Sequence, residues 1–391
     1  MKQPDSVVIA GGGMAGANAA FTLRKLGYEG RVVIVSAETE LPYERPPLSK
    51  DYLRGESPLE KAYVRPAPDY DAEKVELMAG RTATAIDLVD HMVGLDDGKA
   101  LAYGALVLAT GSEPRTIELP HVNPSIVHYL RTVADSDSIR SAAHEAKSAT
   151  VIGGGWIGSE VAASLRQMGL NVTLVSRTPR PLERVLGPEI ADVYRQLHEE
   201  NGVRILAGGA EDAPLDTDLV VVGVGATPRL ELARGANLRI RGGGLIVDEF
   251  LRTSAPDIYA IGDIASAWNP RLRRHVRVEH WDNAKRQGRA VAATIVGQGE
   301  PYDRVPYFYS DQFDLGMEYR GFAPRWDQVV ARGDVKRREF DAFWLGDGKV
   351  IAAMNANRWD DAKVLAALVE SGRPVDPQRL ADPTVSLEEA A

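Results

Sequence analysis

Two sets of glycine residues have the order G-x-G-x-x-G, a spacing that lets a polypeptide backbone approach a phosphate group. They follow two short apolar runs, and their members are Gly11, Gly13 and Gly16 in the first set and Gly153, Gly155 and Gly158 in the second. The first glycine of such a set makes a tight turn, the second lets a pyrophosphate approach the backbone, and the third allows close packing of helix and strand. The phosphates then lie at the positive N-terminus of the following helix. The sequence therefore predicts two dinucleotide-binding sites.

An acidic residue about 20 positions after the first glycine typically holds the ribose hydroxyls of a bound dinucleotide. Glu38 occupies that region after the first set, and Ala37 beside it can contribute only backbone atoms. A single glutamate is by default a solvated surface carboxylate. The ribose assignment of Glu38 therefore depends on the glycines that precede it.

The corresponding place after the second set holds Ser176 followed by Arg177, and no acidic residue occurs at 161–182. Arginine can bind the 2′-phosphate of NADP, whereas an acid there would favour NAD. Arg177 and Arg180 are therefore candidate ligands of a 2′-phosphate. The alternative is that both are ordinary surface arginines of an NADH enzyme, so the predicted nucleotide is NADPH or NADH.

The composition excludes several other kinds of chemistry. The 391 residues include no cysteine, which removes disulfides, thiolate metal sites and thiol-based redox catalysis. Any redox chemistry must therefore take place on a bound cofactor. The net charge of -9 argues against nucleic-acid binding, which needs a basic face. The seven histidines show no ligand spacing such as H-x-x-x-H, so no metal site is predicted.

Both glycine sets lie inside the same strand–helix–strand pattern, and the repetition strengthens each prediction. In the first copy the pattern predicts a strand at 7–9, a helix that ends at about 26 and a second strand at 31–35. In the second copy it predicts a strand at 149–152, a helix at 160–168 and a strand at 171–175. Three more apolar strands are expected at 106–109, 219–222 and 258–261. These elements predict an α/β fold with two Rossmann-like domains.

The pattern of residue types changes from about Val305. Aromatic and apolar residues alternate at 307–309, 339–345 and 350–354, and a helix is expected near 360–371. These features predict a separate C-terminal α+β domain. The tail from Asp376 is proline-rich and acidic, and we expect it to be a loosely packed end.

The uncharged stretch at 6–23 has the look of a signal peptide or a membrane anchor. Its glycines and their spacing favour a nucleotide-binding turn instead, because an anchor needs about 20 strongly apolar residues. The expectation is a cytoplasmic protein without membrane association.

The segment Leu41–Lys50, LPYERPPLSK, strongly resembles a signature that follows the first nucleotide unit in FAD-dependent NAD(P)H:ferredoxin reductases of oxygenase and cytochrome P450 systems. Further similar motifs are T-G at 110–111 with Pro114, G-S-E at 158–160, I-G-D at 261–263, E-H-W-D-N-A at 279–284 and S-D-Q at 310–312. The likeness covers essentially the whole chain. It implies a glutathione-reductase-like flavoprotein fold with a discontinuous FAD-binding domain at 1–112 and 240–304, an NAD(P)H-binding domain at 113–239 and a C-terminal α+β domain at 305–391.

The resemblance also implies individual contacts with the cofactors. Asp263 is expected to hydrogen-bond the ribitol of FAD, and Trp281 is expected beside the flavin ring. The other positions that the resemblance assigns to FAD or NAD(P)H are Ala15, Ala37, Arg45, Lys50, Ala83, Thr110, Gly111, Arg131, Ile157, Glu160, Gly225 and Gly262. Lys50 and Glu160 are implied to approach each other near the flavin N5 and to form the catalytic pair. A buried lysine needs a carboxylate nearby to remain charged, which agrees with such a pairing.

Because the chain has no cysteine, electrons on the flavin have no internal acceptor and must leave to a partner. The resemblance implies a [2Fe-2S] or similar ferredoxin. Arg271, Arg273, Arg274 and Arg277 lie in a stretch without acids at 265–278 and could steer an acidic partner. Arg65 is a weaker candidate for the same surface. The alternative for all of them is a solvated basic loop.

Two other functions stay open at this point. One is a flavoprotein like apoptosis-inducing factor, whose main role is to bind partners under redox control. The other is a reductase linked to rubredoxin or nitrite reductase. The expected oligomeric state is a monomer or a weak dimer.

Overall fold

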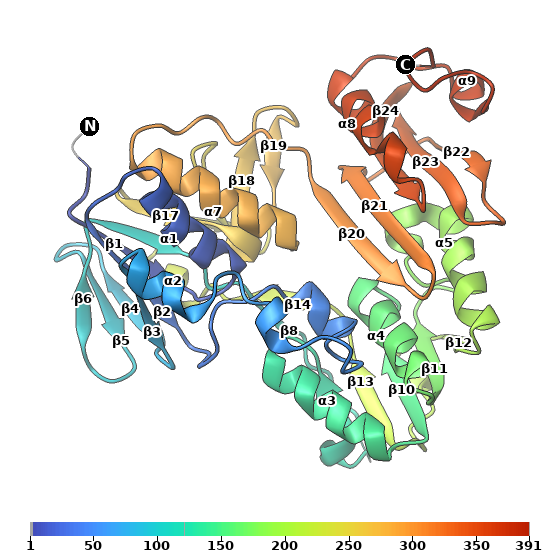
Figure 1. Cartoon of the computed structure of the whole chain (residues 1–391), viewed down its shortest axis with the longest axis horizontal. Helices are drawn as coiled ribbons and strands as arrows, with labels where there is room; N and C mark the ends of the chain where they lie inside the picture. Colours follow the sequence, from blue (N-terminus) through green and yellow to red (C-terminus); the bar gives the residue numbers. More distant parts are fainter. Residues whose placement is uncertain (1–2, 121, 391) are drawn as a thin grey trace. The chain divides into compact units, whose positions relative to one another are not determined.

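The structure is a computed structural model that describes residues 3–120 and 122–390. The chain forms two compact units, each assembled from three stretches of sequence (Figure 1). Unit 1 contains residues 1–45, 58–113 and 226–304, and unit 2 contains residues 46–57, 114–225 and 305–391. Two of the boundaries between the units, at 113/114 and 225/226, lie at the paired strands β8 (Ser112–Pro114) and β14 (Ala226–Pro228).

Unit 1 is built on a five-stranded parallel sheet in the order β17-β7-β1-β2-β3. Val7, Val8 and Ile9 are fully buried, as expected of a parallel strand covered on both faces. The strands are β1 (Ser6–Ala10), β2 (Arg31–Ser36), β3 (Val75–Ala79), β7 (Ala105–Leu108) and β17 (Ile258–Ala260). The helices of the unit are α1 (Met14–Lys25), α2 (Ala67–Ala72), α6 (Glu231–Gly235) and α7 (Trp281–Ile295).

Helices α1 and α7 pack closely, because Gly288 lets the two backbones approach each other. A Cβ atom at Gly288 would lie 2.4 Å from the carbonyl oxygen of Ala15. Two smaller sheets complete unit 1, with orders β4-β5-β6 and β15-β16-β18-β19. Their strands are β4 (Ala83–Asp87), β5 (Met92–Leu95), β6 (Ala100–Ala102), β15 (Ile240–Arg241), β16 (Gly244–Val247), β18 (Ala265–Asn269) and β19 (Arg274–Val276).

Unit 2 repeats the parallel architecture in the order β12-β11-β10-β13-β9. Its strands are β9 (Val127–Tyr129), β10 (Ser148–Ile152), β11 (Asn171–Ser176), β12 (Arg204–Ala207) and β13 (Leu219–Val222). Its helices are α3 (Val133–Glu145), α4 (Trp156–Gln167) and α5 (Glu183–Glu200). Helix α4 begins four residues before the predicted start, so Glu160 lies inside the helix and not at its first position.

The C-terminal part of unit 2 is an antiparallel sheet in the order β20-β21-β24-β23-β22. Its elements are β20 (Tyr307–Gln312), β21 (Leu315–Gly321), β22 (Gln328–Asp334), β23 (Glu339–Gly346), β24 (Lys349–Ala356), α8 (Ala362–Ser371) and α9 (Pro377–Ala381). Residues of α5 share one apolar core with this sheet, and residues of α8, α9 and the tail form a second. The predicted α/β class with a C-terminal α+β part is confirmed.

The expectation of a loosely packed tail was wrong. Leu380 and Leu387 are buried in the second core. The guanidinium of Arg332 donates hydrogen bonds to the carbonyl oxygens of Leu380, Asp382 and Val385. Proline and acidic residues gave no indication of these contacts, because they come from a strand about 50 positions earlier in the sequence.

The units differ from the expected domain ranges in two internal segments, and residues 305–391, expected as a separate domain, belong to unit 2. Residues 226–239 belong to unit 1, where Leu230, Leu232 and Ala233 are buried in its core. Residues 46–57 belong to unit 2, where the Ser136 hydroxyl donates to the carbonyl oxygen of Leu48. Within the part of the chain that the structure describes, no helix combines the length and the apolar composition needed to cross a bilayer.

Candidate active site

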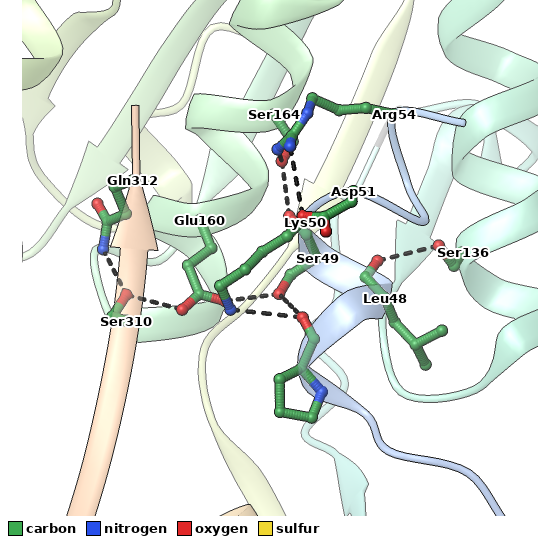
Figure 2. A network of polar contacts seen from close by, with 11 residues as sticks. Leu48, Ser49, Lys50, Asp51, Arg54, Ser136, Glu160, Ser164, Ser310 and Gln312 are labelled. Carbon is green, nitrogen blue, oxygen red and sulfur yellow. Dashed lines mark hydrogen bonds and ion pairs between the residues drawn. The ribbon is translucent and has the colours of Figure 1, made fainter. Parts of the chain in front are cut away.

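A buried ion pair joins the two residues that the sequence proposed as catalytic. The Nζ atom of Lys50 lies 2.7 Å from Oε2 of Glu160, and the two side chains are 10% and 7% exposed. Lys50 follows the 3-10 turn η1 (Pro46–Ser49), and Glu160 projects from α4 (Figure 2). An ion pair this well buried persists only where further hydrogen bonds satisfy its remaining polar atoms.

Hydroxyl groups from two segments supply such bonds to the Glu160 carboxylate. Ser49 donates to Oε2 over 2.5 Å, and Ser310 of β20 donates to Oε1 over 2.7 Å. Both serines are buried. Hydrogen bonds of this kind favour the charged form of a carboxyl group and oppose the effect of burial. The arrangement therefore holds the Glu160 carboxylate in one orientation, with Lys50 as its ion-pair partner.

The turn that carries Lys50 is fixed to its neighbours through main-chain atoms. Ser164 of α4 donates to the carbonyl oxygen of Ser49 over 2.6 Å, and Arg54 donates to the Ser164 hydroxyl (Figure 2). These bonds attach η1 to the same helix that presents Glu160. The position of Lys50 therefore follows from the backbone as well as from the ion pair.

Residues of β20 contribute to the site in a way that the sequence did not predict. The ring centroid of Tyr309 lies 5.7 Å from Nζ of Lys50, within the range of a cation–π interaction. Burial raises the pKa of the Asp311 carboxyl; nearby Lys50 lowers it and Glu160 raises it. In the same strand, Phe308 packs against the apolar core that the sheet shares with α5. The S-D-Q motif at 310–312 was the available signal, although the resemblance assigned no contact to these residues.

The first glycine set has the shape that a dinucleotide requires. Gly11 has a φ of +130°, and a Cβ atom there would lie 2.1 Å from the Ala109 carbonyl oxygen. Gly13, the N-cap of α1, has open space where its Cβ would be, and no side chain caps the helix. A Cβ at Gly16 would lie 2.1 Å from the Gly11 carbonyl oxygen. The residues present therefore fit a pyrophosphate at the start of α1.

The second set repeats this geometry in unit 2. A Cβ at Gly153 would lie 2.3 Å from the Gly223 carbonyl oxygen, and one at Gly158 would lie 1.9 Å from that of Gly153. Gly155, the N-cap of α4, has open space and no side-chain cap. Unit 2 thus also fits a bound pyrophosphate, on the helix that carries Glu160.

Glu38 and Arg45 are close together in unit 1, at the end of β2. Nη2 of Arg45 lies 2.9 Å from Oε1 of Glu38, and Tyr43 donates a hydrogen bond to the other carboxylate oxygen. Glu38 is partly exposed and Ala37 is exposed. The carboxylate is thus held in place and still reachable by a ribose.

The predicted flavin contacts of unit 1 cluster around Asp263. Ser112 donates to Oδ2 of Asp263 over 2.7 Å, which fixes the carboxylate; the sequence had not singled out Ser112. Gly262 has a φ of +74°, and its amide donates to the side chain of Gln287 in α7. Thr110 donates to the Arg229 carbonyl oxygen and the Arg229 amide donates to Gly111, which ties the loop after β7 to residue 229.

The remaining predicted contacts are divided between the units. Ala15 lies buried on α1, Ala83 begins β4 and Trp281 begins α7, all in unit 1. Arg131, Ile157 and Gly225 belong to unit 2, together with Lys50 and Glu160. Ile157 is exposed on the first turn of α4, beside the open space at Gly155.

Comparisons with known proteins show what this arrangement belongs to. Residues 5–288 match the family described as pyridine nucleotide-disulphide oxidoreductase, and residues 307–391 match the reductase C-terminal family. The chain belongs to the pyridine nucleotide-disulphide oxidoreductase family. Members of this family use FAD and NAD(P)H, so the predicted cofactors are confirmed, and the chain is an oxidoreductase.

Individual members of the family are similar to the chain over its whole length. The ferredoxin–NAD(+) reductase component of the anthranilate 1,2-dioxygenase system of Burkholderia cepacia is 40% identical, over 98% of each chain. Putidaredoxin reductase of Pseudomonas putida is 36% identical, over 100% of this chain and 97% of its own. The crystal structure of the ferredoxin reductase for the CYP199A2 system of Rhodopseudomonas palustris is 38% identical and superposes with a TM-score of 0.92, over 99% of this chain and 100% of that one. The predicted resemblance to ferredoxin reductases is confirmed.

Within this family member, the two arginines proposed for a 2′-phosphate have different surroundings. Arg180 forms ion pairs with Asp192 at 3.2 Å and Glu183 at 3.4 Å. Arg177 is exposed and follows the buried Ser176 at the end of β11. Arg177 is therefore the better placed of the two for an anionic ligand.

The basic segment of this oxidoreductase is less uniformly basic than its sequence suggests. Arg271 pairs with Asp303 at 2.9 Å, and Arg277 pairs with Glu279. Arg273 and Arg274 are exposed on the hairpin of β18 and β19. Nη1 of Arg65, the weaker candidate, lies 3.7 Å from Oδ2 of Asp69.

Proposed function

We propose that this protein is an NAD(P)H:ferredoxin reductase that supplies single electrons to a ferredoxin, which in turn feeds a cytochrome P450 or another oxygenase. The observation that carries the proposal is the buried Lys50–Glu160 pair in a chain without cysteine. FAD, when bound, accepts a hydride from NAD(P)H and releases its two electrons one at a time. Its electrons have no thiol to reduce within this chain.

The residues of the chain bind and orient the two nucleotides. In this proposal the glycine turns at Gly13 and Gly155 hold the pyrophosphates of FAD and NAD(P)H, and Glu38 holds a ribose. Lys50 supplies a fixed positive charge beside the flavin. Glu160 keeps that lysine protonated and seats the nicotinamide. Orientation of the two rings against each other accounts for most of the rate enhancement.

The hairpin of β18 and β19 supports an acidic protein as the electron acceptor. Trp268 is 36% exposed on β18, and its ring meets that of His275 edge-on at 5.4 Å. Arg273 and Arg274 lie exposed on the same hairpin. An exposed tryptophan with neighbouring arginines suits a protein interface, and the positive charge would speed association with an acidic ferredoxin.

A panel of electron acceptors tests the proposal. The FAD-loaded protein is given NADPH or NADH and then a [2Fe-2S] ferredoxin, a rubredoxin or ferricyanide. We expect fast reduction of the ferredoxin and slow reduction of rubredoxin. Fast rubredoxin turnover without ferredoxin turnover would contradict the proposal. Slow reduction of the flavin by NAD(P)H, together with slow turnover of every acceptor, would favour the interaction flavoprotein instead.

We also assign FAD to unit 1 and the nicotinamide nucleotide to residues 114–225 of unit 2. A cytoplasmic location follows from the proposed activity, since the reduced nicotinamide pool is held inside the cell. Cell fractionation with activity staining tests the location. Recovery of the activity in the membrane pellet would contradict it.

A further inference from the structure

A chain of hydrogen bonds extends from Glu160 away from Lys50 and ends at a buried histidine. Ser310 donates to Oε1 of Glu160 over 2.7 Å, and Nε2 of Gln312 donates to the Ser310 hydroxyl over 3.1 Å (Figure 2). Oε1 of Gln312 lies 2.9 Å from Nε2 of His198, on α5. All three of these residues are almost completely buried, and neither the sequence nor the proposed function assigns a role to His198 or Gln312.

The donors and acceptors of this chain have only one consistent direction. Because Oε1 of Gln312 can only accept, the proton of His198 must be on Nε2. The amide of Gln312 then donates to a lone pair of the Ser310 oxygen. The Ser310 proton is left to point at the Glu160 carboxylate. Every hydrogen bond therefore donates toward Glu160.

His198 is held in the neutral form at the far end. Burial lowers the pKa of its imidazole, and the bond to Gln312 opposes this effect. Its Nδ1 atom is buried and has no hydrogen-bond partner among the described residues. A protonated ring would bury an unpaired N–H at that atom, which is costly. The neutral tautomer with the proton on Nε2 has no such cost.

We propose that His198 and Gln312 are positioning residues that act on Glu160 through Ser310. A serine hydroxyl rotates and can donate in several directions. With the Gln312 amide on its oxygen, the Ser310 proton is committed to Glu160, which keeps the carboxylate turned toward Lys50. This role depends on the proposed function only in assigning Glu160 to the flavin site.

Substitutions that break the chain at two separate points test this role. Gln312→Met and His198→Met keep approximate size but cannot donate. His198→Gln places an amide donor where Nε2 of the histidine was, so it should keep the chain of hydrogen bonds intact. Gln196→Met is the control on α5, because the side chain of Gln196 donates to Asp192 and takes no part in this chain of hydrogen bonds. Ser310→Ala removes only the last donor.

The readout is the ¹³Cδ chemical shift of Glu160 in the FAD-loaded protein labelled with ¹³C-glutamate, followed from pH 5 to 9 and assigned with Glu160→Gln. We expect the ¹³Cδ resonance of Glu160 to respond to pH differently from the wild type in both Met variants and in Ser310→Ala. His198→Gln and Gln196→Met should match the wild type. The pH profile of hydride transfer should shift in the same variants.

A wild-type Glu160 titration in folded Gln312→Met or His198→Met protein would overturn the proposal. If both Met variants fail to fold, a wild-type titration in Ser310→Ala would overturn it equally. Because no ferredoxin is present, a failure here is distinct from a failure of the proposed function. That failure would appear only in the acceptor panel.

Discussion

The Nζ atom of Lys50 and the Oε2 atom of Glu160 lie 2.7 Å apart, with both side chains nearly buried. Ser49, next to Lys50, is 111 positions from Glu160, and Ser310 is 150 positions from it. Three segments thus converge on one carboxylate in unit 2.

Single substitutions at Lys50 and Glu160 should affect the rate of flavin reduction and the stability of the protein. Lys50→Gln should slow flavin reduction by about 10²-fold, the usual loss when a preorganised charge is removed from a reaction centre. Glu160→Gln leaves a buried lysine without a counter-ion and should cost about 3–5 kcal/mol of stability. Stopped-flow reduction and thermal unfolding measure the two effects.

The double variant Lys50→Met/Glu160→Leu serves as the control for this pair. It should recover stability, because no charge is then left buried and unpaired, but it should still reduce the flavin slowly. A double variant that reduces the flavin at the wild-type rate would show that the pair plays no part in catalysis.

Substitutions at the two open glycines should block the two nucleotides separately. The backbone at Gly13 and Gly155 is extended, and no atom lies near either missing Cβ, so Gly13→Asp and Gly155→Asp should fold. Gly13→Asp should lose FAD, whereas Gly155→Asp should keep FAD and lose NAD(P)H binding. Flavin absorbance and nucleotide titration measure these outcomes, and Gly235→Ala in α6 is a control. Loss of FAD in Gly155→Asp would contradict the assignment.

Arg177 should determine the preference between NADPH and NADH. Charge-assisted hydrogen bonds contribute about 1.5–3 kcal/mol, so Arg177→Ala should lower kcat/KM for NADPH by about 10- to 100-fold and leave NADH little changed. Arg180→Ala should have a smaller effect, because Asp192 already pairs with that guanidinium. Steady-state kinetics with both nucleotides decide the matter. Strong preference of the wild type for NADH would show that neither arginine binds a phosphate.

The arginines of the β18–β19 hairpin should affect the protein acceptor alone. Arg273→Glu and Arg274→Glu should lower kcat/KM for ferredoxin and flatten its dependence on salt, because screening acts on exposed charges. Ferricyanide reduction should not change. Arg271→Gln is a matched control, since Asp303 already neutralises that residue. An equal loss in all three variants would argue against docking at the hairpin.

Asp341 should make the stability of unit 2 depend on pH. Burial, together with nearby Asp361, raises the pKa of this fully buried carboxyl to about 7, and Arg358 at 3.1 Å only partly opposes the shift. The folded protein then binds the proton more tightly than the unfolded chain. Stability should therefore fall as the pH rises from about 4 to 7 and level off above that.

Asp341→Asn removes this dependence. The variant should be more stable than the wild type at pH 8, by about 2–4 kcal/mol, and nearly equal to it at pH 4. Circular dichroism melts at both pH values measure the difference, with the exposed Asp360→Asn as control. An Asp341→Asn variant less stable at pH 8 would show that the ionised carboxylate is stabilising.

Local patterns in the sequence determined most of the architecture. Continuous apolar runs bury strands such as Val7–Ile9, and glycine spacing defines the turns at Gly13 and Gly155, because both effects act over a few neighbouring residues. The absence of cysteine is a property of composition alone, and it limits redox chemistry to the cofactor. The resemblance in Leu41–Lys50 pointed to the family, which the comparisons confirmed.

Only the tertiary structure decided which distant side chains meet. The hydroxyls of Ser49 and Ser310 reach Glu160 from opposite ends of the chain, and Ser112 orients Asp263 across 151 positions. Likewise, an ion pair with Asp192 engages Arg180. Arg332 donates hydrogen bonds to the C-terminal tail, which its composition had suggested was loosely packed. Such contacts depend on how strands and helices pack, and no local propensity or spacing encodes them. The candidate residues for chemistry, such as Lys50 and Glu160, could be named from the sequence, but the side chains that orient them could not.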